Sequence, residues 1–226
     1  MSSTNRGAER RADDAYATPP WVVHRLLDDC ALFREWLPRN HGDDVRWLEP
    51  ACGDGAIIKA VAAWLGAKQG PRWFANDIRQ DAIDAVLAST HPSVKTRCGD
   101  FLPDGWPGAG RVDAVLMNPP FALAEEFVRV ALARTLGPVG VLLRLGWLSS
   151  AGRAPLLRDQ PPDVFVLPDR PSFTGHGTDS ADYAWFCWPP ADEPRTRERG
   201  SIRVLALTPK AERLARSRRP NPSQEL

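Results

Sequence analysis

The residues best suited to chemistry form a short segment near the middle of the chain. An apolar run at 112–117 ends there at Asn118, Pro119, Pro120 and Phe121. The run is short and partly β-branched, which predicts a buried strand, and open α/β sheets bind ligands at the carboxyl ends of such strands. The amide of Asn118 offers a donor and an acceptor. The two prolines lack N–H groups, so we expect the carbonyl groups of this turn to have no local partner and to face a ligand. With the flat ring of Phe121, the segment suits a planar ligand that carries an amino group. A strand that simply ends in a proline-stiffened turn is the alternative.

A second candidate site is the segment at 49–56, which lies between a predicted strand and a predicted helix. Gly53 and Gly55 let the backbone approach a ligand closely, and the helix start presents free N–H groups. The segment has neither a GxGxxG pattern nor the Lys-Ser/Thr pair of a phosphate loop. Glu49 and Asp54 would repel a phosphate but attract a ligand with ammonium and sulfonium charges. A tight turn without a ligand is the alternative interpretation.

Further acidic residues follow the next two predicted strands. Asp77 lies 22 residues after Gly55, a distance at which an acidic side chain can bind ribose hydroxyls in dinucleotide folds. It is also placed to cap the following helix. Asp100 and Phe101 follow the third predicted strand, where a carboxylate and a ring fit the amino group and the face of an adenine.

In this order the motifs resemble the gamma class of DNA N6-adenine methyltransferases, over about residues 15–190. The resemblance is closest to the small enzymes of phages and mobile elements, because no separate target-recognition domain is expected. It implies a Rossmann-like, doubly wound sheet of seven strands with the last antiparallel, the cofactor S-adenosyl-L-methionine, and DNA as the partner that carries the target adenine. It assigns catalysis to Asn118, Pro119, Pro120 and Phe121. It assigns cofactor binding to Tyr16, Thr18, Glu49, Pro50, Ala51, Gly53, Gly55, Asp77, Ile78, Asp100, Phe101 and Asn118.

The expected chemistry needs no carboxylate base. Hydrogen bonds from adenine N6 to the Asn118 side-chain oxygen and the Pro119 carbonyl would draw the nitrogen toward tetrahedral geometry and expose its lone pair. In a duplex the base must first be flipped out, which costs a few kcal/mol, and stacking on Phe121 returns ~1–3 kcal/mol. More contacts are therefore needed.

The segment at 170–180 is the hypothetical source of those contacts. Phe173 or His176 would lie near the base, and Arg170 would hold a phosphate. Functional residues concentrate on loops, although a merely polar, mobile loop is the alternative.

The elements that must position these residues alternate between strand and helix patterns, which predicts the doubly wound α/β sheet. Strands are expected at 46–50, 72–76, 95–98, 112–117, 139–145, 164–167 and 183–188, with an optional edge strand at 201–207. Helices are expected at 21–37, 57–65, 80–87 and 125–136, the first with Thr18 as its N-cap. Trp185 and Trp188 should pack inside.

The composition restricts the function. The chain has 226 residues and a net charge of +1, so any nucleic-acid contact must use a local patch. Its four cysteines are scattered, which argues against a metal site or disulfides and favours a reducing cytosol. The resemblance implies that this is the cytosol of a bacterial or phage-infected cell. No apolar run has the ~20 residues that a membrane helix needs. We expect a flexible arm at 1–14, a methyltransferase domain at 15–208 and a basic, disordered tail at 209–226.

Three alternative functions remain at this stage. An N5-glutamine protein methyltransferase could use the same Asn118 site, but such enzymes usually have Tyr after the two prolines and a long N-terminal helical domain. RNA N6-adenine methylation shares the chemistry. A non-catalytic binder of nucleic acid or of a partner would leave an intact motif idle.

Overall fold

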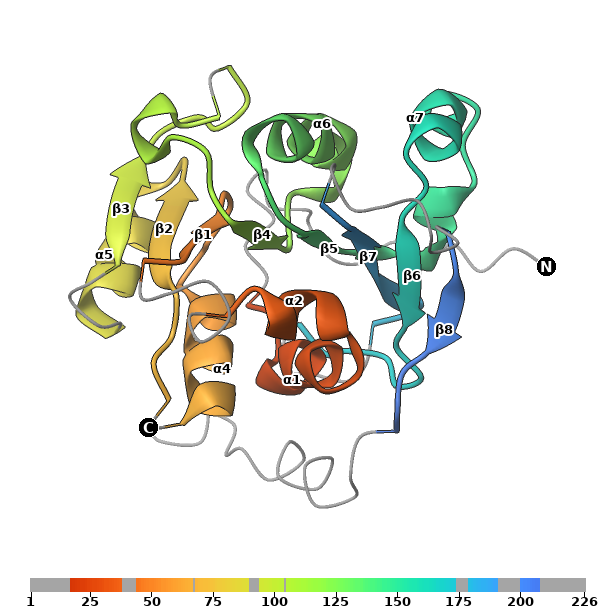
Figure 1. Ribbon diagram of the computed structural model, residues 1–226, viewed down its shortest axis with the longest axis horizontal. Coiled ribbons are helices and arrows are strands. Elements are labelled where there is room, and N and C mark those ends of the chain that lie inside the picture. The colour runs from red at the N-terminus through yellow and green to blue at the C-terminus, as the bar shows by residue number, and fades with distance from the viewer. Residues whose placement is uncertain are drawn as a thin grey trace, which may run out of the picture.

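The computed structural model describes residues 17–37, 44–66, 68–89, 94–103, 105–173, 179–190 and 200–207, and these form an eight-stranded sheet with helices on both faces (Figure 1). The strand order is β3-β2-β1-β4-β5-β7-β6-β8. The predicted α/β class is confirmed. The strands are β1 Arg46–Glu49, β2 Arg72–Asp77, β3 Lys95–Cys98, β4 Ala114–Met117, β5 Val139–Arg144, β6 Asp163–Val166, β7 Tyr183–Trp188 and β8 Ile202–Val204.

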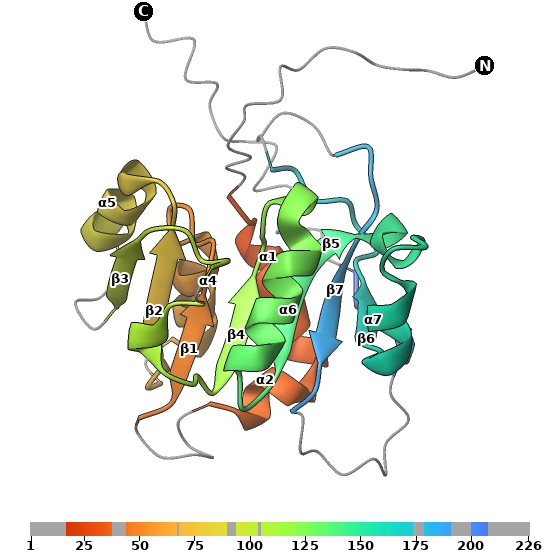
Figure 2. The same cartoon turned by 90° about the horizontal axis from the view of Figure 1, so that it is seen from above.

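The strand directions bring the carboxyl ends of all strands but β7 to one edge of the sheet. Strands β1 to β5 pair in parallel, whereas β7 runs antiparallel to both β5 and β6 (Figure 2). The carboxyl ends of β1 to β5 therefore meet the amino end of β7. The predicted seventh strand, at 183–188, is β7, and it is antiparallel as expected. The strand count is eight and not seven, because the optional edge strand at 201–207 is present as β8, which pairs in parallel with β6.

Each face of the sheet is covered by its own helices and hydrophobic cluster. Strand β4 is apolar throughout because its side chains enter both clusters. Ala114 and Leu116 belong to one cluster, and Val115 and Met117 belong to the other. Such continuous apolar runs are typical of strands buried on both faces. The first face carries α1 Pro20–Asp29, α2 Ala31–Glu35, α4 Ala56–Leu65 and α5 Gln80–Ser89; the second carries α6 Ala124–Arg134 and α7 Ala154–Asp159.

The prediction of one continuous helix at 21–37 is wrong, because the segment forms two helices. It breaks at Cys30, whose backbone is extended (φ −100°, ψ 105°), into α1 and α2. Both Leu32 and Phe33, which belong to α2, are buried. The Arg34 guanidinium donates to the Leu27 carbonyl at the end of α1 (2.8 Å), so a cation satisfies an acceptor that the break exposes.

Several predictions lie outside the described residues. These are the arm at 1–14, the tail at 209–226, Tyr16 and His176. Within the described ranges, no helix combines the length and apolar composition that crossing a bilayer requires. Trp185 and Trp188 are buried, as predicted.

Candidate active site

The candidate site lies at the edge of the sheet where the carboxyl ends of β1 to β5 meet. We call the ends of β1, β2 and β3, with Glu49, Gly53, Asp77 and Asp100, the acidic half. We call the ends of β4 and β5 and the start of β7, with Asn118, Phe121, Arg144 and Tyr183, the aromatic half. Because β1 pairs with β4 in parallel, the two halves meet at these neighbouring strands. The edge is the position at which open α/β sheets bind ligands.

The glycine turn after β1 is tied directly to the end of β2. Gly53 (φ +51°) and Gly55 (φ +78°) are left-handed, and Gly55 is the N-cap of α4. The Gly53 N–H donates to Asp77 Oδ2 over 2.9 Å. A Cβ on Gly53 would meet no atom within 4 Å, so the backbone dihedral and not crowding requires glycine here. The predicted turn and the predicted acid are therefore one unit.

Glu49 is an unusual group for the end of a strand. Its side chain is 2 % exposed, and its Oε2 has no hydrogen-bond partner among the described residues. Burial, followed by the nearby charges of Asp54 and Asp77, raises the pKa of Glu49 well above its ordinary value. A buried carboxyl with an unpaired oxygen is a ready acceptor for a cationic donor.

Asp77 makes several bonds at once. Its Oδ2 accepts from Gly53, and its Oδ1 accepts from the backbone N–H (3.0 Å) and Nε (3.2 Å) of Arg79, the residue before α5. Asp77 thus shapes the turn into α5 but is not its N-cap residue. A carboxylate has about four lone-pair sites, so Asp77 retains capacity for a ligand hydroxyl.

Asn76 was not among the predicted site residues, yet it holds three strand ends together. Its buried amide donates to the carbonyl oxygens of Pro50 (3.1 Å) and Gly99 (3.0 Å), at the ends of β1 and β3. Its own oxygen has no partner among the described residues. A polar amide directly after the apolar run at 73–75 was the sequence signal for this role.

The two residues after β3 behave differently from each other. Asp100 is exposed, and its Oδ1 accepts from the Leu102 N–H (3.0 Å). Phe101 is only 1 % exposed and stacks on Phe127 inside the core (centroids 5.4 Å apart). The expectation that its ring presents a face to an adenine is therefore not supported. Ile78, which follows Asp77, is 65 % exposed and supplies an apolar surface at this edge.

The aromatic half begins with a bond between segments that are far apart in the sequence. Asn118 Nδ2 donates to Thr18 Oγ1 over 3.1 Å. Thr18 is buried and is not the N-cap of α1, a position that Pro19 occupies. The bond uses the donor of the amide and leaves its oxygen as an acceptor. The Pro120 carbonyl accepts from the Leu123 N–H (3.0 Å), so the expectation of partner-free carbonyls is wrong for Pro120.

The ring of Phe121 contacts a cation, Arg144, and a second ring, Tyr183. The Arg144 guanidinium carbon is 5.0 Å from the Phe121 ring centroid, and the Tyr183 centroid is 5.9 Å away. Arg144 Nε donates to the Tyr183 hydroxyl (3.3 Å), which donates to Asp179 Oδ2 (2.7 Å). Phe173 packs edge-on against Tyr183 at 5.1 Å. The predicted Phe173 therefore lies one ring away from Phe121.

The charges in this half are perturbed by their neighbours. Burial, aided by Asp179, raises the pKa of Tyr183 to about 12. Burial acts to raise the pKa of Asp179, but hydrogen bonds from Tyr183 and Ala181 and the charge of Arg144 lower it overall. Arg144 was visible in the sequence as the one charge in the strand predicted at 139–145. The predicted phosphate ligand Arg170 is paired with Asp182 (2.8 Å).

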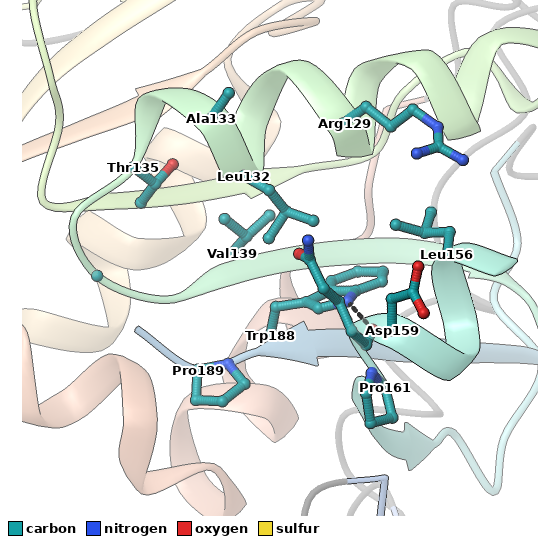
Figure 3. Close-up of a pocket in the computed structure, with 12 residues that line it drawn as sticks. Arg129, Leu132, Ala133, Thr135, Val139, Leu156, Asp159, Pro161, Trp188 and Pro189 are labelled. Atoms are coloured by element: carbon teal, nitrogen blue, oxygen red, sulfur yellow. Dashed lines mark hydrogen bonds between the residues drawn. The ribbon is translucent and has the colours of Figure 1, made fainter. Parts of the chain in front are cut away.

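A pocket of about 540 Å³ lies elsewhere, between α6, α7 and the amino end of β5 (Figure 3). Val139 and Trp188, which line it, are the first residue of β5 and the last of β7, so it faces the edge opposite to Asn118. It contains none of the predicted site residues. Among the described residues, no group of three or more His, Cys, Asp and Glu side chains is placed to hold a metal ion.

Comparison with known proteins identifies the fold. No protein-family model and no curated protein matches the chain. A type I restriction-modification methyltransferase subunit from Streptococcus thermophilus superposes with a TM-score of 0.65 at 15 % identity, over 92 % of this chain and 54 % of that one. A Listeria monocytogenes protein assigned to the class I S-adenosylmethionine-dependent methyltransferases gives 0.62 at 15 % identity, over 88 % and 68 %.

The 23S rRNA methyltransferase ErmE is also similar, with a TM-score of 0.55 at 15 % identity, over 89 % of this chain and 76 % of that one. The fold is thus that of the class I methyltransferases. Identities this low establish the fold alone, and this chain spans only about half of the Streptococcus subunit.

Proposed function

We propose that the protein transfers a methyl group from S-adenosyl-L-methionine to the N6 amino group of adenine in DNA. The observation that carries the proposal is the position of Asn118. It follows β4, next to β1 with Glu49, and its amide is fixed by Thr18 with the oxygen left to accept.

The acidic half fits the cofactor. Two buried oxygens, Glu49 Oε2 and Asn76 Oδ1, lack partners among the described residues and suit the donors of an ammonium-bearing ligand. Asp77 would accept from the ribose hydroxyls, and Ile78 with Asp100 would flank the adenine. The S-adenosyl-L-methionine sulfonium supplies an activated methyl group.

The aromatic half would prepare the acceptor nitrogen. The lone pair of adenine N6 is delocalised into the ring. Hydrogen bonds from its two N–H groups to Asn118 Oδ1 and the Pro119 carbonyl would localise that pair on nitrogen. The N–C bond would form as the S–C bond breaks, S-adenosylhomocysteine would leave, and N6 would lose one proton to water. Holding two reactants in line can lower a barrier by as much as ~7–11 kcal/mol. Phe121 would stack on the extruded base.

DNA is favoured over protein by the planar rings of Phe121, which follows the two prolines, and of Phe173. The similarity to the Streptococcus restriction-modification subunit supports DNA, and that to the rRNA enzyme keeps RNA as the second candidate. A glutamine side chain offers an amide nitrogen but little surface for these rings.

The test offers methyl-labelled S-adenosyl-L-methionine to DNA, RNA and protein in parallel. We expect label in DNA adenine, and a fall of about 100-fold or more with Asn118→Ala. Thr18→Val, which removes only the hydroxyl that holds the amide, should lower turnover about tenfold. Label in protein alone would contradict the proposal, and tight cofactor binding without transfer would favour a non-catalytic binder.

A further inference from the structure

Arg144 ends β5 and covers the Phe121 ring, and no step of the proposed reaction uses it. Its guanidinium carbon is 5.0 Å from the ring centroid. The residue is exposed and stands directly opposite Tyr183 in the β5–β7 register. A charge at the end of an apolar strand, within the candidate site, requires an explanation.

The position of Arg144 is set by an anchor. Its Nε donates to the Tyr183 hydroxyl (3.3 Å), and that hydroxyl donates to Asp179 Oδ2 (2.7 Å). The Asp179 Oδ1 accepts from the Ala181 N–H, which fixes the carboxylate to the start of β7. The guanidinium is therefore kept beside the ring that the proposed function assigns to the target base.

A guanidinium and a nucleobase are both flat and both bind the face of a phenyl ring, so they cannot contact the same face together. A stacked base is held more strongly than an exposed cation over the same ring. The arginine that leaves the ring remains within side-chain reach of the base. The planar guanidinium of Arg144 can donate two parallel hydrogen bonds to a phosphate, which suits it to this ligand.

We propose that Arg144 is a positioning residue that binds the phosphate beside the target adenine and yields the face of Phe121 to the base. The inference rests on the proposed function and adds the contact that couples the nucleic-acid backbone to base stacking. The net charge of +1 means that a nucleic acid must be bound by local cations, and Arg144 is the cation that contacts the Phe121 ring.

Two probes separate this role from a structural one. Single-stranded oligodeoxyadenylate carries base and phosphate, and adenosine carries the base alone; both are titrated with S-adenosylhomocysteine present. For Arg144→Ala we expect oligonucleotide affinity to fall about tenfold and the slope of log K against log salt to shrink by about 1. Adenosine affinity should rise about two- to fivefold, because the competing cation is gone.

The matched control is Arg203→Ala. Arg203 lies on the edge strand β8, and its guanidinium carbon is 5.9 Å from the ring centroid of Phe165 in β6. This variant should change neither affinity. Tyr183→Phe removes the anchor but keeps the charge, so we expect a smaller loss of oligonucleotide affinity with an unchanged salt slope.

The outcomes distinguish the two proposals. If Arg144→Ala weakens both probes alike, or leaves the salt slope unchanged, the inference is overturned while the function stands. If the same Arg144 effect appears with oligoriboadenylate and not with DNA, the inference stands and the DNA assignment fails. A wild-type protein that binds none of the probes overturns both.

Discussion

The two halves of the site are built by different interactions. In the acidic half, side chains bond to backbone groups of neighbouring strand ends: Asp77 to Gly53, and Asn76 to Pro50 and Gly99. In the aromatic half, side chains stack on and bond to one another around Phe121. The first is fixed once the sheet has formed, whereas the second can rearrange without breaking the sheet. The difference suits one half to a constant cofactor and the other to a large substrate that must enter and leave.

Among the variants that test the difference between the two halves, Asn76→Ala should have the largest effect on stability. The change removes both bonds that hold the ends of β1 and β3 and leaves two carbonyl groups short of a partner. We expect a loss of about 2–4 kcal/mol in the free energy of unfolding, measured by denaturant titration. Thr96→Ala, in the strand β3 itself, is the control and should cost less than half as much. An equal cost would show that the strand ends do not depend on Asn76.

Asp77→Asn tests whether the acidic half binds the cofactor. The amide retains an acceptor for Gly53 but loses the charge and the second oxygen, which accepts from Arg79. The dissociation constant for S-adenosyl-L-methionine should therefore rise about tenfold, as measured by calorimetry. Asp81→Asn is the matched control, because Asp81 also lies near Arg79 (3.8 Å) but is largely exposed. The same loss in both variants would count against a direct role for Asp77.

Phe173→Ala tests whether the aromatic half extends beyond Phe121. The edge-on contact with Tyr183 would be lost, and we expect KM for DNA to rise about fivefold while cofactor affinity is unchanged. Leu132→Ala, in the pocket at the opposite edge, should leave KM unaltered. If Phe173→Ala weakens cofactor and DNA together, the two halves are not separable.

Glu49→Gln should have the smallest effect on the fold, and it has a defined sign. The pKa of Glu49 is raised by burial in the folded protein, so the folded state keeps a proton that the unfolded chain releases. Stability should therefore fall as pH rises from the ordinary carboxyl pKa to the raised one. The Gln variant should lack this fall in Tm while binding a cationic cofactor more weakly. A wild-type Tm that rises across that window would contradict the assignment.

The sequence predicted the elements well where a local pattern decides them. The strand β4 was visible as an apolar run, and the helix α4 as the segment after a glycine turn. The break at Cys30 was not visible, because the apolar residues on both sides of it continue at helical spacing. Thr18 had the pattern of an N-cap, yet its hydroxyl bonds to Asn118, 100 residues away. Phe101 had the type of an adenine-stacking ring, but Phe127 draws it into the core.

By itself, the sequence determined the order of the strands along the chain and the types of residue that follow each one. It thereby placed Glu49, Asp77 and Asn118 at strand ends, because a parallel sheet sends every carboxyl end to the same edge. Only the tertiary structure decided which side chains at that edge meet. The contacts between Arg144, Tyr183 and Phe121 arise because β7 runs antiparallel beside β5. A pairing between strands so distant in sequence is set by packing, which no local pattern records.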